Sequence, residues 1–313
     1  MNTITFTCRI LTPMFLNGAD GQTPELRAPS IKGALRFWWR AIHGHLPLED
    51  IKDKSDKKKI LVKGLKSLET EIFGGSGDKV QRSNVLIQVM PNGKPQIGVH
   101  ELVPHKPFMK GNAFNEGTTF MVKLTLLTKL KDENGNVYFG LDHLKNIFML
   151  TCYLGGFGKR VRRGMGSTDI IAIDADGEEE KVPSPIDLKF IYSIIAKFSP
   201  FYQVSGEKII FNYSGRSPQY GYITEIQLGK PYSNQHEVLN KISTATHATK
   251  QKHGFAYDPS MGHAFKGRYA SPVYTSIAKG SVRPIITTLN LAPDRNANEA
   301  SLFIQQDYKN KIL

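Results

Sequence analysis

The segment that most restricts how this chain can fold is SIKGALRFWWRAIH, residues 30–43. Counted from Ile31, its apolar residues recur at spacings of three, four, seven, eight and eleven, which is the pattern of one apolar stripe on an α-helix. Ser30 predicts the N-cap, and Gly44 followed by Pro47 predicts the end of the helix. Because the stripe contains two tryptophans, the helix has to pack against a second layer of secondary structure.

A second stripe on the same helix is basic. Lys32, Arg36, Arg40 and His43 recur at nearly the same rotational spacing, so their side chains line the flank of the buried face. The plain interpretation is an amphipathic core helix with a solvated basic flank. The alternative is that this row of cations faces a polyanion.

The charge balance favours an acidic partner. Lys and Arg together number 41 against 28 Asp and Glu, a formal net charge of +13 over 313 residues. Such an excess predicts a nucleic acid, another acidic partner or a membrane surface. No run of about 18 apolar residues is present, and the polar N-terminus lacks the layout of a signal peptide. We therefore expect a cytoplasmic protein without a membrane segment.

Neither the cysteines nor the histidines suggest a metal. Cys8 and Cys152 lie inside apolar patterns with no CxxC neighbour, which favours buried thiols in a reducing compartment. His43 and His45 are two residues apart, but no acidic or cysteine partner stands close in the sequence. We expect neither a metal nor a cofactor.

The first half of the chain follows the order strand, helix, strand, strand, helix, strand. The strands are predicted over residues 3–10, 84–90, 118–127 and 168–173, and the second helix over residues 141–154. A short helix ending near Phe73, an irregular loop over residues 100–114 and a lysine-rich insert at residues 52–59 lie between them. This is the order of the ferredoxin-like α+β fold, an antiparallel sheet backed by two helices.

The second half contains a similar mixture of helices and strands in a less regular order. Helices are predicted near residues 188–197, 236–250 and from 298, and strands near residues 208–212, 222–228, 269–277 and 283–289. We therefore expect two ferredoxin-like domains, residues 1–180 and a degraded second unit at residues 181–313.

The loop GGFGKRVRRGMGS, residues 155–167, is the strongest candidate for a binding site. It places Lys159, Arg160, Arg162 and Arg163 among five glycines. Glycines let backbone amides approach phosphates, and arginines offer planar donor pairs to phosphate oxygens. We expect these arginines to bind RNA and to be dispensable for stability. A flexible solvated hairpin is the alternative.

Two specific nucleotide motifs fail in this loop. A Walker A sequence needs Ser or Thr after the lysine, but Arg160 follows Lys159. A dinucleotide fingerprint counted from Gly156 needs a glycine where Val161 stands. The loop also precedes a strand rather than a helix, so no helix N-terminus faces a bound phosphate. An extended nucleic acid strand therefore fits better than ATP.

Three segments together resemble the RAMP superfamily, and within it the first-numbered RAMP subunits of type III-B CRISPR (Cmr) effector complexes. They are TPMFLNGAD at residues 12–20, ELRAPSIKGALRFWWRA at residues 25–41 and the glycine loop, with a weaker patch, GRYASPVYTSIAKG, at residues 267–280. The resemblance implies two ferredoxin-like domains and a non-catalytic subunit that binds the 3′ region of crRNA and the target RNA beside other RAMP subunits. It carries over to Lys32, Arg36, Arg40, the four loop cations and Arg268, and it implies that RNA cleavage lies in other subunits.

Two other functions stay open at this point. A related metal-independent endoribonuclease that processes crRNA could use His43 as general base toward a 2′-hydroxyl, although a surface histidine is the simpler interpretation. A nucleotide-binding enzyme is disfavoured by the failed motifs. In the preferred reading, the basic side of the helix forms one wall of an RNA groove and the glycine loop forms the other.

Overall fold

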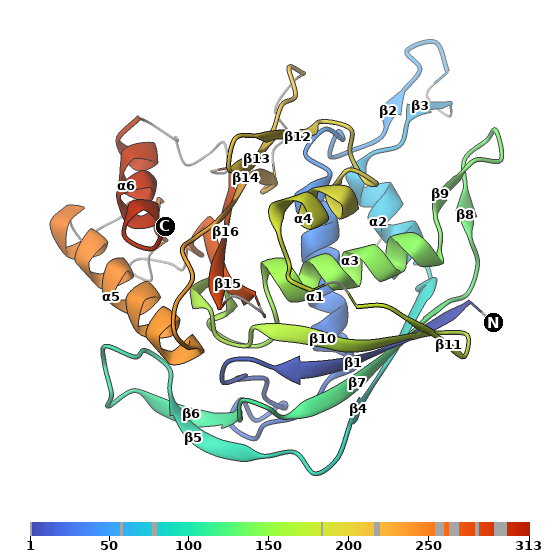
Figure 1. Cartoon of the computed structure of the whole chain (residues 1–313). Helices are drawn as coiled ribbons and strands as arrows, with labels where there is room; N and C mark the ends of the chain where they lie inside the picture. Colours follow the sequence, from blue (N-terminus) through green and yellow to red (C-terminus); the bar gives the residue numbers. More distant parts are fainter. Residues whose placement is uncertain are drawn as a thin grey trace.

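Two antiparallel five-stranded sheets, with helices packed against them, make up the chain (Figure 1). The computed structural model describes residues 2–56, 59–76, 80–182, 184–215, 220–253, 260–262, 269–278, 282–290 and 299–313. No helix in these ranges is long and apolar enough to cross a bilayer.

The first sheet has the strand order β11-β10-β1-β7-β4. Its strands are β1 (Thr3–Ile10), β4 (Val85–Pro91), β7 (Thr119–Leu126), β10 (Thr168–Ala175) and β11 (Glu178–Glu180). Helices α1 (Ala28–Ile42) and α3 (Leu141–Leu154) connect them in the predicted strand–helix–strand order and cover one face of the sheet (Figure 1). The predicted ferredoxin-like arrangement of this half is confirmed.

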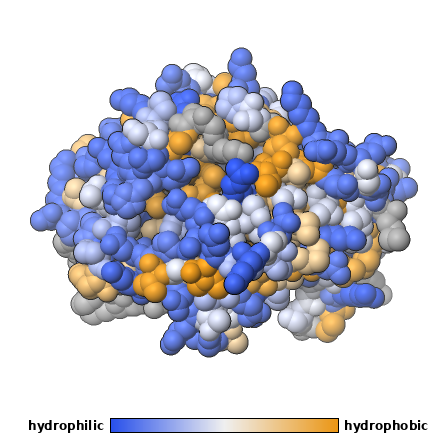
Figure 2. All heavy atoms as spheres, turned by 60° about the horizontal axis from the view of Figure 1, so that its bottom comes forward, coloured by the Kyte–Doolittle hydropathy of each residue, from blue (hydrophilic) through white to orange (hydrophobic). Residues whose placement is uncertain are grey.

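Buried and half-buried residues alternate along the central strands, so the two faces of this sheet differ in burial. In β1, Ile4, Phe6 and Cys8 are buried beneath the helices, while Thr5 and Thr7 on the other side are only half-buried. Hydrophilic residues predominate on the side of the molecule shown in Figure 2, with the hydrophobic ones in separate groups.

Helix α1 begins earlier than its sequence predicts. The N-cap is Arg27 rather than Ser30, and the first turn contains a proline, whose fixed φ suits that position. Ser30 is therefore helical. The apolar stripe behaves as expected, because Ile31, Leu35 and Trp38 are at most 2 % exposed.

The second sheet has the order β12-β13-β14-β16-β15. Its strands are β12 (Tyr202–Ser205), β13 (Lys208–Phe211), β14 (Ile223–Leu228), β15 (Val273–Ala278) and β16 (Arg283–Leu289), and its helices are α4 (Leu188–Ile195), α5 (Gln235–His253) and α6 (Glu299–Asn310). The run β14-α5-β15-β16-α6 repeats the ferredoxin-like order, and β13, which precedes it, pairs with the outer side of β14. This second unit is therefore a rearranged ferredoxin-like fold.

The first unit also contains helix α2 (Leu65–Phe73) and three two-stranded hairpins. They are β2 (Ile51–Lys52) with β3 (Ile60–Val62), β5 (Ile97–Glu101) with β6 (Lys110–Phe114), and β8 (Leu130–Lys131) with β9 (Val137–Phe139). The prediction that residues 100–114 are irregular is thus wrong at both ends of the segment, because these ends pair as β5 and β6. Sequence patterning misses this pair because prolines at 104 and 107 interrupt the alternation between the strands.

The two sheets share their largest core. One continuous cluster of buried side chains runs from Phe6 in the first sheet to Ile226 and Ile285 in the second. Trp38 of α1 joins the halves directly, with its ring 5.0 Å from that of Tyr274 on β15. The domain division at residue 180 stays a prediction, whereas the shared core makes the stability of the halves interdependent.

Replacing Trp38 with alanine should lower the free energy of unfolding by about 3–5 kcal/mol, because a large side chain is removed from a site that cannot collapse fully. Urea unfolding followed by circular dichroism measures this change, and both halves should unfold in one transition. Leu61→Ala is the control, since Leu61 is 56 % exposed. A Trp38→Ala midpoint equal to that of the control would contradict this account of the core.

Candidate nucleic-acid interface

The glycine loop is closely folded against its surroundings. Its backbone pairs internally, with Phe157 N donating to Gly166 O at 3.0 Å, and outward, with Lys159 N donating to Phe15 O at 3.0 Å. Gly156 has a φ of +99°, and a Cβ there would lie 2.1 Å from Gly166 O. These contacts require glycine and hold the loop in one shape, so the flexible-hairpin interpretation does not describe it.

Two buried hydroxyl groups fasten the loop to both halves of the molecule. Thr12 Oγ1 donates to Gly164 O at 2.6 Å and accepts from Ser167 N at 3.0 Å. Ser167 Oγ in turn accepts from Ile277 N of β15 at 3.1 Å. The sequence does not single out this pair, because its partners lie far apart along the chain. Thr12 and Ser167 are the end residues of two quoted motifs, but they have no charge to mark them.

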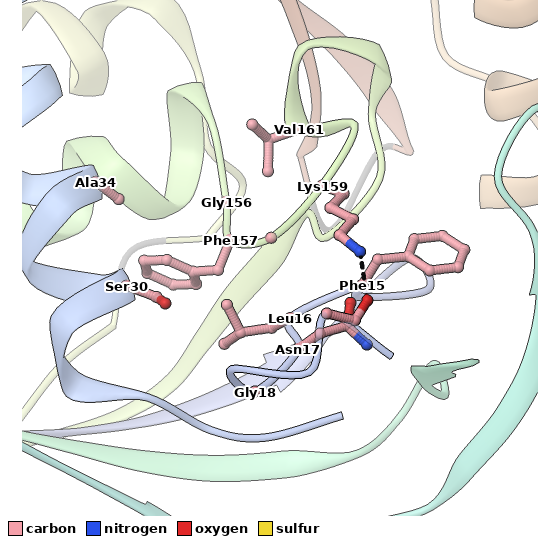
Figure 3. Close-up of a pocket in the computed structure, with 12 residues that line it drawn as sticks. Phe15, Leu16, Asn17, Gly18, Ser30, Ala34, Gly156, Phe157, Lys159 and Val161 are labelled. Carbon is pink, nitrogen blue, oxygen red and sulfur yellow. Dashed lines mark hydrogen bonds between the residues drawn. The ribbon is translucent and has the colours of Figure 1, made fainter. Parts of the chain in front are cut away.

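A pocket of about 350 Å³ lies between the loop, the Phe15–Gly21 turn and the N-terminal half of α1. Figure 3 shows Ser30 and Ala34 on the helix, Phe157 pointing toward them, and Leu16 with Asn17 on the turn below. The helix and the glycine loop, which are more than 100 residues apart in the sequence, are therefore two walls of one depression.

Lys159 is the cation of this pocket. Its side chain is exposed, and its ammonium group donates to the carbonyl oxygen of Gly21 at 2.7 Å, the dashed contact in Figure 3. An ammonium group has three donors, so this single contact leaves Lys159 able to bind an anion in the pocket.

The basic stripe of α1 faces α2 rather than the pocket. Arg36 Nε lies 2.6 Å and Arg40 Nη1 2.7 Å from the same Oε1 atom of Glu69, whose side chain is 8 % exposed. Lys32 lies one turn nearer the N-terminus, where burial and the neighbouring Arg36 lower its pKa. The helix wall is present as expected, but small residues rather than these cations line the pocket.

The loop arginines divide into an exposed one and two that hold the fold together. Arg160 is exposed and has a left-handed backbone, with φ +64°. Arg162 stacks on Tyr274, 4.5 Å from the ring centroid, and donates to Ser271 O. Arg163 donates to Met261 O at 3.1 Å and to Val273 O at 3.3 Å, and burial lowers its pKa.

The expectation that all three arginines are dispensable for stability is therefore corrected, because two of them satisfy carbonyl groups of the second unit. Arg268 lies outside the described residues.

His43 is enclosed in the core. Its ring is 4.4 Å from that of Trp39, and Nδ1 lies 2.6 Å from Trp39 O. Burial, with smaller effects from His45 and His143, lowers the pKa of His43 to about 3. A ring buried this deeply does not reach a 2′-hydroxyl at the surface. Within the described ranges, no three His, Cys, Asp or Glu residues gather as metal ligands would.

The fold and the loop place the chain in a known family. The sequence profile of the RAMP superfamily matches residues 7–169, which contain the first sheet, α1 and the glycine loop. The chain belongs to the RAMP superfamily.

Two curated relatives come from Pyrococcus furiosus. The chain is 28 % identical to the CRISPR system Cmr subunit Cmr1-2 over 194 residues, which covers 53 % of this chain and 93 % of that protein. It is 37 % identical to Cmr subunit Cmr1-1 over 73 residues, covering 23 % of this chain and 18 % of that protein.

Solved structures show the same fold across the whole chain. The crystal structure of Cmr1 from Pyrococcus furiosus in its apo form covers 100 % of this chain and 97 % of its own, with 18 % identity and a TM-score of 0.56. A chain of the type III-B Cmr-β complex bound to cognate target RNA covers 99 % of both, with 12 % identity and a TM-score of 0.58.

Arg163→Ala should lower the free energy of unfolding by about 2–3 kcal/mol, because buried carbonyl oxygens lose their donor. Arg160→Ala should change it by less than about 0.5 kcal/mol, since an exposed side chain is removed. Thermal and urea unfolding of the two variants gives the comparison. Equal melting temperatures for both variants and the wild type would show that Arg163 does not fasten the halves together.

Acid should destabilise the protein through His43. Its pKa is about 3 in the folded chain and 6.5 in the unfolded one, so the unfolded state binds the extra proton between these values. Stability is fully present above pH about 6.5 and falls toward pH 3, at up to about 1.4 kcal/mol per pH unit from this group.

Urea unfolding of the wild type and of His43→Phe across that range measures the dependence. The free energy of unfolding should depend less steeply on pH in His43→Phe, by the contribution of about one bound proton. His236→Phe, which changes an exposed residue, should keep the wild-type dependence. A slope in His43→Phe equal to that of the wild type would assign the acid sensitivity to other groups.

Proposed function

We propose that this chain is a non-catalytic, RNA-binding subunit of a cytoplasmic type III-B CRISPR effector complex, where it holds the 3′ region of crRNA or the target RNA beside other RAMP subunits. Membership of the RAMP superfamily and similarity to two Cmr1 subunits support this assignment. The observation that carries it is the depression between α1 and the glycine loop, because its shape and its donors suit a single RNA strand.

The walls of this depression allow a close approach. Ser30 and Ala34 line it with small side chains along α1. On the loop side, Gly156 and Gly158 line the pocket without a side chain. A sugar–phosphate backbone can therefore approach both walls without a bulky side chain in between.

Exposed cations stand on the rim of the depression. Among the candidate RNA-binding residues that the structure describes, Lys159 and Arg160 are the exposed ones, and Lys32 lies on the outer flank of α1. Arg36 and Arg40 share the charge of Glu69, so their contribution to RNA binding is smaller than their number suggests. The affinity is expected to be electrostatic and largely independent of sequence.

The enzymatic alternative loses its candidate base. The crRNA-processing hypothesis depended on His43, and the burial and lowered pKa of this side chain leave it no route to an RNA hydroxyl. A binding role is the function that the geometry supports best.

The double variant Lys159→Ala, Arg160→Ala should bind single-stranded RNA more weakly, and the slope of log affinity against log salt should become shallower by about 1.4, from about 0.7 per lost phosphate contact. Fluorescence anisotropy with labelled RNA over a series of salt concentrations measures both quantities.

The matched control is Lys129→Ala, Lys131→Ala at the β8–β9 hairpin, which removes the same charge on the far side of the molecule from α5 and α6 (Figure 1). Equal losses in both double variants would mean that only net charge matters and would contradict the proposed site.

A further inference from the structure

A second pocket lies on the other side of the glycine loop. Its volume is about 350 Å³, and it is bounded by the loop, by α5 and by the segments around Met261 and Ser271. The side chains that matter for its chemistry are Arg160, Arg162, Arg163, Thr246 and Lys250. None of the lining residues that the structure describes is acidic.

The cations in this pocket repel one another. Burial lowers the pKa of Lys250, and the neighbouring Arg163 and Arg160 lower it further. Burial likewise lowers the pKa of Arg163, Tyr308 partly offsets this, and Arg160 and Arg162 lower the pKa further. Positive groups gathered in a partly dry depression are costly unless an anion neutralises them. The pocket is thus electrostatically suited to an anion.

Hydrogen-bond donors remain available for that anion. Lys250 Nζ makes one bond, to Gly262 O at 2.6 Å, and the Arg160 guanidinium donates to no group in the described part of the chain. An ammonium group has three donors and a guanidinium five, so several still point to no protein partner. Because carbonyl groups and aromatic rings already fix Arg162 and Arg163, an anion would meet a pre-oriented site.

We propose that this pocket binds one phosphate group of the RNA strand that occupies the depression between α1 and the loop. The inference rests on the proposed function and adds a second phosphate site to it. Val161 lines both pockets, so the loop forms a ridge between them. A strand that leaves the first pocket over Arg160 and Val161 delivers a neighbouring phosphate to Lys250.

The test combines one variant of the protein with a scan in which each phosphate of the RNA is replaced in turn. Lys250→Gln removes the charge but keeps a donor for Gly262 O. It should raise the Kd for single-stranded RNA at least about tenfold, as expected for a charge-assisted hydrogen bond, and make the salt slope shallower by about 0.7. Lys252→Gln is the control on the same helix, because Lys252 is exposed and pairs with Asp307 at 3.5 Å.

Replacing each phosphate in turn by an uncharged methylphosphonate identifies the bound position, provided that the RNA is only long enough to span the two pockets and is thereby held in one register. In the wild type, one position should weaken binding far more than its neighbours, and in Lys250→Gln that position should lose its special effect. The scan with the wild-type protein needs no variant, so it still tests the inference if Lys250→Gln misfolds.

Three results would overturn the inference. If Lys250→Gln binds RNA like Lys252→Gln while Lys159→Ala, which changes the first pocket alone, binds RNA more weakly, the second site is absent but the proposed function stands. If the wild type binds no RNA, both fail. If inorganic phosphate at fixed ionic strength raises the melting temperature of the wild type but not of Lys250→Gln, while the methylphosphonate scan is flat, the pocket is a free-phosphate site.

Discussion

The docking of the glycine loop onto the rest of the molecule is the constraint on which the structure depends. The loop pairs with Phe15 on one side, and through Ser167 and Arg163 it bonds to β15 on the other. The two sheets also share a hydrophobic core, so the hydrogen bonds of the loop join the same two units that this core joins. A change in either unit is therefore expected to move both pockets, since one segment forms a wall of each.

This arrangement divides the positive charge of the chain between two tasks. Arg162 and Arg163 form no ion pair with an acid in the described part of the chain and instead donate to carbonyl groups, and Arg36 and Arg40 converge on Glu69. Arginine suits such sites because its guanidinium stays charged when partly buried and its planar donors meet several acceptors. The cations left for RNA are fewer than the formal charge implies.

Much of the fold follows from local sequence pattern, whereas much of the site does not. The apolar stripe of α1, the bounds of α3 and the ferredoxin-like order of the first unit are determined by periodicities that a single sequence displays. Strand β12 was missed because it is short and largely exposed, and the pairing of β5 with β6 depends on contacts across a long loop. The pairing of Arg36 with Glu69 joins residues 33 positions apart, and no spacing rule predicts such a contact.

The central claim is that RNA lies along the glycine loop, and photo-crosslinking tests it most directly. RNA that contains 4-thiouridine would be bound to the full chain, irradiated and mapped by mass spectrometry of the crosslinked peptides. The account predicts crosslinks in residues 15–21, in the first turns of α1 and in residues 156–163. Crosslinks confined to the outward face of β1 and β7 would contradict it.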